Sequence, residues 1–393
     1  MNYIQQAFKG QHQWWHYLIG FVIILIAWQF IGSLPLLIAL IMAMMKSGNG
    51  LQNMPSEISE LTNLLGQNTF LTLMLVSFLI GLIGLFFVIK VIHKQTILSL
   101  TTARDKIDWK RIWFAFFFWG IISSAMVVLD YYLQPEGYVW NFDLQKFLIL
   151  AVIAIVLLPF QTSFEEYLFR GYLMQGIGVI SINKKFPLYF IIFTVSIILY
   201  FVLDNTISFR WYFKLLYLLL TLFLIIFSNS NESYLESKTY KMIHENIARR
   251  WLPLVITSVI FGVMHIANPE VEKLGYVIMV YYIGTGFFLG IITLMDEGME
   301  LALGFHAANN LFTALLVTAD WTALQTDSVL KDISDPSVMG IGEIFVPVFI
   351  VFPILIFIFT KMYGWNNWKE KLFGDVSNPI ANQMHELSDD TNV

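Results

Sequence analysis

The sequence contains no cysteine among its 393 residues. This absence excludes disulfide bonds, thiolate nucleophiles and cysteine-ligated metal sites. Charged residues are also scarce, at 13% of the chain, whereas soluble domains carry about 25%. The net charge of −5 is spread thinly and indicates no nucleic-acid-binding face. We therefore expect no nucleic-acid partner.

Hydrophobic residues make up 57% of the chain and lie in long runs. Examples are IWFAFFFWGIISSAMVVL at 112–129 and FKLLYLLLTLFLIIF at 213–227. Uninterrupted apolar runs of about 18 residues or more are typical of transmembrane helices. The first stretch, from Tyr17 to about Met45, is too long for a signal-peptide core and has no small-residue cleavage site. We expect it to be retained as a helix.

The hydrophobic pattern predicts an all-α fold, a polytopic transmembrane helical bundle of about ten spans. The chain is thus expected to be a multi-pass protein of the cell membrane, surrounded by the lipid bilayer. The predicted spans lie at 17–45, 69–93, 111–133, 147–175, 187–203, 211–228, 251–268, 274–295, 300–319 and 343–362.

Basic residues orient these spans. The segment 90–111 carries six Lys and Arg residues, and the positive-inside rule places such a segment in the cytoplasm. Alternation then predicts that both termini are cytoplasmic and that 48–67 and 320–342 are external loops. We expect a single membrane-embedded domain over 1–374 and a disordered cytoplasmic tail at 375–393, which is polar and weakly patterned.

A small set of ionisable groups lies inside the predicted spans. An ionisable side chain deep in a bilayer costs at least about 2.5–3.5 kcal/mol on insertion scales. Most charges of this chain avoid that cost because they lie at span ends. The exceptions are Glu165, Glu166, Arg170, His265 and His306.

The spacing of these groups indicates their geometry. Glu166 and Arg170 are four residues apart, so they share a helical face and can form an ion pair. Glu165 is rotated by about 100° from Glu166 and faces elsewhere. His306 and Asn310 are also four residues apart. Three helices therefore each present polar groups that can converge on one pocket.

Such a set of side chains is suited to activating water. A carboxylate accepts a proton, an imidazole accepts or donates one, and an asparagine amide can donate to a developing oxyanion. Two histidines and a glutamate are also a ligand set for catalytic zinc. A divalent metal such as zinc and a metal-free mechanism are both compatible with the residues, and peptide hydrolysis fits either.

Each feature also has a structural interpretation. The Glu166–Arg170 pair could be an ion pair that only locks helices together. His265 could be a core histidine that binds a backbone carbonyl, and His306 with Asn310 could hold helices together, as polar residues do in membranes. Taken together, these structural interpretations are less favoured than each is alone, because nearly all the deep ionisable groups fall on three spans.

Three motifs resemble those of a known family. They read EEYLFR at 165–170, FGVMH at 261–265 and HAANN at 306–310. They match the patterns EExxxR, FxxxH and HxxxN, in that order, of the intramembrane CAAX-protease and bacteriocin-processing (Abi) proteases. This family includes the type II CAAX prenyl endopeptidase. The resemblance covers about 60–320, and the three motifs together are far more specific than EExxxR alone.

The resemblance implies an α-helical membrane endopeptidase with a core of about eight spans. By motif position it implies that Glu165 activates water together with His265. His306 and Asn310 would orient the water or stabilise the oxyanion, and Glu166 with Arg170 would support the site. Members of the family are widely described as metalloproteases, and a metal-free glutamate mechanism has also been argued.

The chain departs from the family pattern in one place. Arg170 and Phe261 are separated by about 90 residues, where the family usually needs a few tens. The excess, about 183–250, holds two predicted spans and a polar stretch. We interpret it as an inserted hairpin packed outside a protease core at about 60–182 and 250–320. An insertion of two spans preserves the orientation of everything that follows.

Two other functions compete with the endopeptidase. A transporter could use the same buried charges as an ion relay, although the chain has no evident inverted repeat. A non-catalytic scaffold could bind a peptide, for example as an immunity protein. For the endopeptidase, the expected partner is a protein or peptide substrate that reaches the site from the membrane or from the cytoplasmic side.

Overall fold

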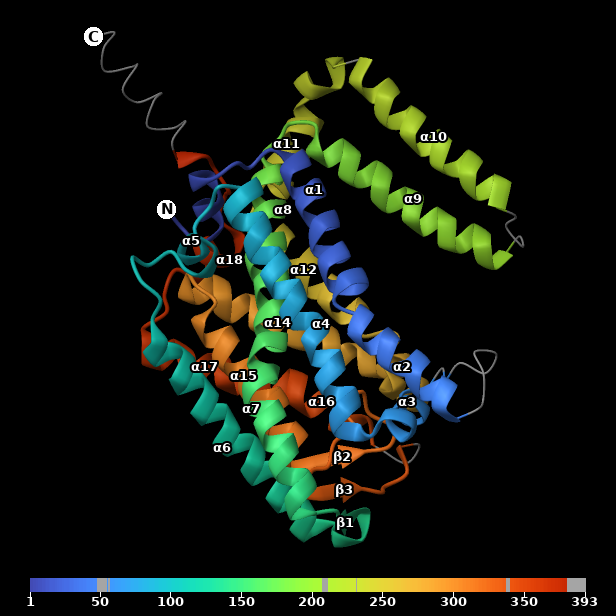
Figure 1. Ribbon diagram of the computed structural model, residues 1–393. Coiled ribbons are helices and arrows are strands. Elements are labelled where there is room, and N and C mark those ends of the chain that lie inside the picture. Colours follow the sequence, from blue (N-terminus) through green and yellow to red (C-terminus); the bar gives the residue numbers. More distant parts are fainter. Residues whose placement is uncertain (48–54, 56, 207–210, 231, 337–339, 380–393) are drawn as a thin grey trace.

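The computed structural model describes residues 1–47, 55, 57–206, 211–230, 232–336 and 340–379, and 78% of the fold is helical. The helices run between two ends (Figure 1). We call the end that holds the first helical turn, Ile4–Lys9, and the last helix, α18 (Trp368–Phe373), the terminal end. The opposite end holds three short strands and is called the sheet end.

Among the described residues, six helical segments are long and apolar enough to cross a membrane, and three shorter apolar helices accompany them. Every predicted span coincides with a helical segment, which confirms a mostly helical bundle with candidate membrane spans. The six long segments are Trp14–Ser47, Gln67–Ile92, Trp109–Leu133, Leu144–Ser181, Tyr276–Asp296 and Ile341–Tyr363, and the shorter ones are Phe186–Tyr200, Leu215–Ile226 and Trp251–Val263.

The centre of the bundle is one long helical segment. It starts as α7, continues through a π-helical stretch at the EEYLFR motif, and ends as α8. A π-helical turn inside an α-helix often marks a functional site, because it redirects side chains at little cost in backbone hydrogen bonds. The elements that form this centre are α7 (Leu144–Glu166), the π-helical Tyr167–Leu173, α8 (Met174–Ser181), α4 (Gln67–Phe87) and α15 (Glu300–Leu316), with α6 (Trp109–Leu133) packed on α15.

Helices α12 (Trp251–Val263) and α14 (Met279–Asp296) form a closely packed pair. A methyl group placed at Gly286 would lie 2.5 Å from the Ser258 carbonyl oxygen, so only glycine permits this approach. The small residues of GTGFFLG at 284–290 therefore serve helix packing. The short helix α13 (Pro269–Leu274) connects the pair.

Three strands close the sheet end. They are β1 (Tyr138–Trp140), β2 (Val317–Ala319) and β3 (Leu330–Asp332), in the order β1–β3–β2. β1 is antiparallel to β3, and β2 is parallel to it. The sequence analysis expected an all-α fold with loops here. Three-residue strands carry no alternating pattern long enough to be recognised, so this sheet was missed.

An ionic cluster ties together the terminal end. Arg104 binds Asp296 at 2.7 Å and Glu300 at 3.0 Å, and Arg111 binds Asp296 at 2.5 Å. The two carboxylates are buried, and two guanidinium groups share their charge, so neither is left unpaired. The cluster joins Arg104 and the start of α6 to the turn between α14 and α15.

The remaining helices surround this core. The inserted segment forms two long antiparallel helices, α9 and α10, that lean away from the bundle (Figure 1). Residues 375–379, the start of the predicted tail, are described and pair with the chain near Arg249, and the rest of that tail lies outside the described residues. The other helices are α1 (Trp14–Leu25), α2 (Leu34–Ser47), α3 (Ile58–Leu65), α5 (Ile97–Thr101), α9 (Phe186–Thr206), α10 (Trp211–Ser230), α11 (Lys238–Ile247), α16 (Ile341–Val346) and α17 (Phe352–Tyr363).

Candidate active site

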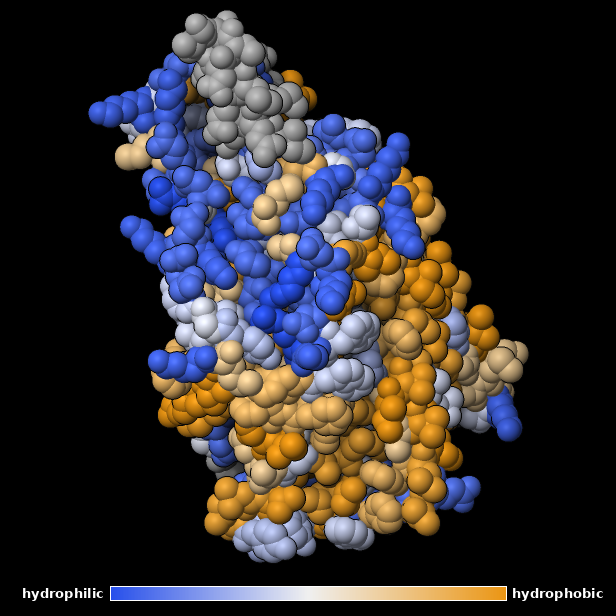
Figure 2. All heavy atoms as spheres, turned by 90° about the vertical axis from the view of Figure 1, so that its left-hand side faces the viewer, coloured by the Kyte–Doolittle hydropathy of each residue, from blue (hydrophilic) through white to orange (hydrophobic). Residues whose placement is uncertain are grey.

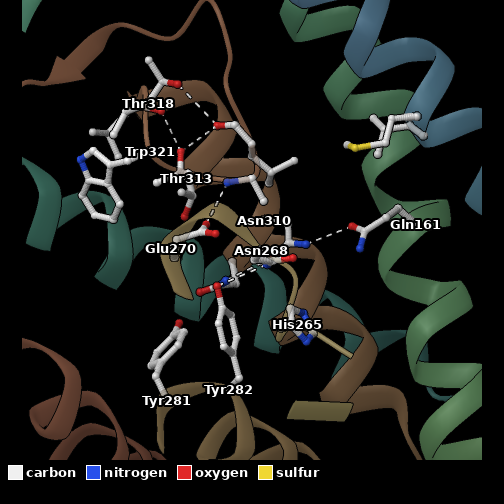
Figure 3. Close-up of a pocket in the computed structure, with 18 of the residues that line it drawn as sticks. Gln161, His265, Asn268, Glu270, Tyr281, Tyr282, Asn310, Thr313, Thr318 and Trp321 are labelled. Carbon is white, nitrogen blue, oxygen red and sulfur yellow. Dashed lines mark hydrogen bonds between the residues drawn. The ribbon is translucent and has the colours of Figure 1, made fainter. Parts of the chain in front are cut away.

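The three motifs meet at one cavity between α7, α15 and the turn that follows α12. The cavity has a volume of about 450 Å³, which is room for several water molecules and a short peptide segment. Glu165, His265 and Asn310 all contribute to its wall (Figure 3 shows the last two together with Gln161). The predicted convergence of the three spans on one pocket is therefore present in the structure.

The predicted Glu166–Arg170 pair forms behind this cavity. The guanidinium of Arg170 donates to Glu166 Oε1 at 3.0 Å and to the Gly286 carbonyl at 3.2 Å. Its Cζ atom also lies 4.2 Å from the centre of the Phe261 ring. Both charged side chains are almost completely buried. Removing either partner would leave an uncompensated charge in an apolar interior, which is far more costly than removing both.

His306 connects this buried pair to the cavity. Its Nδ1 lies 2.7 Å from Glu166 Oε1, and its Nε2 lies 3.6 Å from Glu165 Oε2. Because a carboxylate can only accept, Nδ1 carries a hydrogen in this arrangement. Glu166 thereby fixes the ring orientation, and the opposite nitrogen faces Glu165. The two adjacent carboxylates thus lie on either side of one imidazole.

Glu165 is held by a directed chain of hydrogen bonds. Trp119 Nε1 donates to Asn309 at 3.1 Å, and Asn309 donates to Asn310 at 3.2 Å. Asn310 donates to Gln161 at 3.0 Å (Figure 3), and Gln161 donates to Glu165 Oε1 at 2.5 Å. Every step points toward the carboxylate. The chain fixes one carboxylate oxygen and leaves the other, Oε2, toward His306.

His265 lies beyond the end of its helix. We predicted that it sits within a span, but α12 ends at Val263 and His265 is in the following turn. Its Nδ1 bonds the Phe261 carbonyl at 2.8 Å, and its ring stacks on Tyr282 at 4.5 Å between centres. The carbonyl bond places the hydrogen on Nδ1 and leaves the Nε2 lone pair as an acceptor. The interpretation of His265 as a carbonyl-bonded histidine and the interpretation as a site residue are therefore both compatible with this geometry.

Several residues of the cavity wall were not among the predicted site residues. Gln161 is the most important, since it links Asn310 to Glu165. Its signal was present, because it lies four residues before Glu165 in an otherwise apolar run. Asn309, Tyr282 and Glu270 carried no comparable signal, since their roles depend on contacts between distant segments.

Glu270 lies at the outer wall of the cavity, on α13. Its Oε1 accepts a hydrogen bond from the Ala323 backbone N–H at 2.9 Å. Burial raises the pKa of this carboxyl, and the Ala323 N–H partly opposes the effect. The bond joins α13 to the loop between β2 and β3, so this loop is held against the mouth of the cavity.

The donor atoms can be compared with the requirements of a metal site. Catalytic zinc takes three protein ligands from His, Glu, Asp or Cys. Among the described residues no such group of three lies close enough to hold an ion. In this arrangement His306 has one nitrogen on Glu166 and the other facing Glu165, which leaves Glu165 and His265 as donors. The residues as arranged do not fit a three-ligand metal site.

Comparisons with known proteins agree with the motif resemblance. The chain is 24% identical over 321 residues to "Uncharacterized protein YyaK" of Bacillus subtilis (strain 168), covering 81% of this chain and 83% of that protein. No solved structure gives a significant match. A family model, "Type II CAAX prenyl endopeptidase Rce1-like", matches residues 144–312, the range that contains all three motifs. Residues 144–312 of this chain are therefore similar to the type II CAAX prenyl endopeptidase Rce1-like family.

Proposed function

We propose that this protein is an intramembrane endopeptidase that hydrolyses a peptide bond with water activated by Glu165 and His265. The observation that supports it best is the geometry of Glu165. This carboxylate lies on the 450 Å³ cavity, and a hydrogen-bond chain from Trp119 through Asn310 fixes one of its oxygens. A fixed, cavity-facing carboxylate with one free oxygen is a suitable general base.

The proposed reaction begins with a water molecule in the cavity. Glu165 takes one proton from the water, while His265 Nε2 accepts a hydrogen bond that orients it. The water oxygen forms a bond to the substrate carbonyl carbon, and the carbonyl oxygen becomes an oxyanion. The C–N bond then breaks, and the leaving nitrogen takes the proton held by Glu165. Glu165 returns to its ionised form, so the cycle closes.

The neighbouring residues would support this reaction electrostatically. An asparagine amide carries two N–H donors, and Asn310 uses one of them on Gln161. The second can donate to the oxyanion, where a preorganised donor contributes most. His306, whose Nδ1 lies 2.7 Å from Glu166 Oε1, would keep Glu165 and the water molecule aligned. Glu166 and Arg170 would support His306.

The wider organisation follows the same proposal. We place the protein in the cell membrane as one domain, residues 1–374, with its protease core at about 60–182 and 250–320. The hairpin α9–α10 would be an accessory element. A peptide segment is the proposed substrate, since the matched family is named for an endopeptidase.

Substitution of the catalytic groups tests the proposal. Glu165→Gln, His265→Ala and Asn310→Ala should each lower cleavage of a quenched-fluorescent peptide library by the purified full-length protein. For Glu165→Gln we expect a loss of about 100-fold or more, the usual range for a general base. Thermal unfolding in detergent should remain near wild type, because Glu165 is not part of the buried ion pair.

Glu136→Gln is a matched control, since this exposed glutamate lies in a surface turn at the sheet end. Unchanged cleavage by Glu165→Gln would refute the catalytic role. If wild type binds peptides without cleaving them, a peptide-binding scaffold would replace the enzyme as the best interpretation. Ion flux through proteoliposomes that Glu165→Gln abolishes would instead favour the transporter.

Metal dependence can be tested separately. Because both His306 nitrogens face glutamates, we expect peptidase activity to survive incubation with EDTA or phenanthroline. Activity should be compared before and after chelation and after adding Zn²⁺ back. Loss on chelation with recovery on Zn²⁺ addition would show that the side chains rearrange around a metal, and the metal-free steps above would then be wrong.

A further inference from the structure

The large cavity extends from the catalytic residues toward the sheet end, and a much smaller one of about 100 Å³ reaches past His306 to Phe261 and Phe305. On α7 its wall uses Gln161 and Glu165, which precede Glu166 and so lie toward β1. On α15 it uses Asn310 and Thr313, which follow His306 and so lie toward β2. Both helices therefore place the cavity on the sheet-end side of the buried ion pair.

The path toward the terminal end is closed by packed side chains. Arg170 fills the space behind Glu166, and the rings of Phe261, Phe288 and Phe305 are each 2% exposed. Phe288 and Phe305 lie 4.7 Å apart between centres and pack edge to face. A substrate on the terminal side would have to displace this aromatic layer to reach Glu165.

At the sheet end the cavity meets a second groove of about 600 Å³. The two share Asn268 and Trp321, so they adjoin at the loop between β2 and β3. Glu270 holds this loop by its bond to the Ala323 backbone N–H. The second groove continues along α13 and the start of α3 to the surface. Together they form a route from the sheet-end surface to Glu165.

The two ends of the molecule differ in charge. Figure 2 shows hydrophilic residues gathered at the terminal end, above a hydrophobic belt. Lys46, Lys146, Lys273 and Lys331 are the basic residues whose described side chains lie toward the sheet end. The other basic residues with described side chains, apart from the buried Arg170, belong to or adjoin elements nearer the terminal end: Lys9, Lys90, Lys94, Arg104, Lys106, Lys110, Arg111, Lys184, Lys185, Lys238, Lys241, Arg249, Arg250, Lys361, Lys369 and Lys371.

This distribution orients the site. Cytoplasmic loops carry the excess of Lys and Arg, so the terminal end faces the cytoplasm and the sheet end faces outward. We propose that the substrate is a cationic peptide segment on the outer face of the membrane, which reaches Glu165 through the sheet end. The cleavage part of this proposal rests on the proposed function. It departs from the expectation of access from the membrane or the cytoplasm.

The charge of the substrate follows from the two grooves. Among the described residues that line the inner cavity, Glu165, Glu270 and Asp332 are acidic and none is Lys or Arg. The outer groove has Glu57, Glu272 and Asp320 against Lys273, and Lys331 binds Asp320 at 2.8 Å, so one acidic charge remains in excess. A cleft lined by one sign of charge attracts ligands of the opposite sign. Lysine or arginine near the cleaved bond is therefore favoured.

The absence of cysteine permits a direct test of access. Single variants Thr313→Cys, Glu136→Cys and Lys106→Cys would each be expressed in bacterial cells and treated with a membrane-impermeant maleimide. Thr313 is exposed within the cavity, Glu136 lies on the sheet-end surface and Lys106 lies on the terminal end. We expect labelling of Thr313→Cys and Glu136→Cys in intact cells, and of Lys106→Cys only after permeabilisation.

The labelling result is independent of catalysis. If Thr313→Cys and Glu136→Cys react only after permeabilisation, outer access is refuted even when the protein cleaves peptides. If Glu136→Cys reacts in intact cells and Thr313→Cys does not react under either condition, the route is closed and the proposal also fails. Outer labelling in a protein that never cleaves would refute the proposed function and leave the access geometry standing.

The charge preference has its own test. Two quenched-fluorescent peptides that differ only in Lys or Glu flanking the same central residues would be offered to purified protein. We expect about tenfold higher kcat/KM for the Lys peptide at low salt, on the scale of electrostatic steering, and a smaller ratio at high salt. Reversal of the outer charges in Glu57→Lys/Glu272→Lys should reduce the ratio, whereas Glu136→Lys should not. Equal cleavage of both peptides would overturn the cationic preference.

Discussion

The catalytic core and the α9–α10 hairpin are both built of apolar helices, yet they differ in how polar groups are used. In the core, buried Glu166 binds Arg170 on its own helical segment and His306 on α15. In the hairpin, a polar contact such as the bond between Ser196 and Thr221 at 3.1 Å joins its own two helices. The hairpin otherwise presents large apolar side chains outward.

The hairpin and the core therefore differ in what holds their helices together in a membrane. Lipid tails are as apolar as leucine side chains, so apolar surface alone gives helices little reason to associate. The hairpin therefore leans away from the bundle (Figure 1), with few contacts beyond α8 and α11. The core is held by close packing and by hydrogen bonds that have no alternative partner in lipid.

Loss of the Arg170 guanidinium should have the largest effect, because it lowers the stability of the core. Arg170→Met leaves Glu166 as an unpaired buried charge, and breaking such a pair costs about 3–5 kcal/mol. We expect a much lower unfolding temperature in detergent, or failure to accumulate. The double variant Glu166→Gln/Arg170→Met should recover most of the loss, because glutamine still accepts from His306. A double variant as unstable as the single one would contradict the role of charge.

A smaller effect, on catalysis, is expected from loss of Gln161, which orients the proposed base Glu165. Gln161→Ala removes the last donor to Glu165 and should lower kcat roughly 10- to 100-fold, since misplacement of a reacting group by about 1 Å has such effects. KM should change little, because Gln161 positions the base. Gln175→Ala is the matched control, since it loses bonds to Ser99 and Gln95 away from the cavity. Equal kcat losses in both variants would indicate general destabilisation.

The hairpin should give the smallest effect. Its two ends lie close together, since Lys185 binds Glu232 at 2.5 Å and the Tyr240 hydroxyl bonds the Lys184 carbonyl at 2.7 Å. Replacing 187–236 by a short flexible linker should therefore leave the fold and peptide cleavage in detergent unchanged. Size-exclusion chromatography and the library assay would check this. An aggregated or inactive product would make the hairpin part of the core.

The local parts of the site were predictable from sequence. The Glu166–Arg170 pair follows from helical spacing, and its formation is confirmed. The separate direction of Glu165 follows from the same rule. The contact of His306 with Glu166 could not be predicted, because 140 residues separate them and only tertiary packing brings them together. The predicted catalytic roles stay predictions.

The turn at His265 shows why spans were easier to predict than their ends. Residues 264–268 continue the apolar run, so hydropathy extended the span beyond Val263. Pro269 then starts the next helix, and the residue before a proline is biased away from the helical conformation. The chain uses these residues as a turn that carries His265 to the cavity.

The small sheet has a consequence for the distance between the two catalytic helices. β1 ends four residues before α7 begins, and β2 follows α15 directly; both pair with β3. The pairing of both strands with β3 thus determines how far α7 is displaced along its axis relative to α15. A slip of one residue in a strand moves the chain by about 3.3 Å. That is more than the 2.7 Å bond from His306 to Glu166 could absorb, so strand register at the membrane surface governs alignment at its centre.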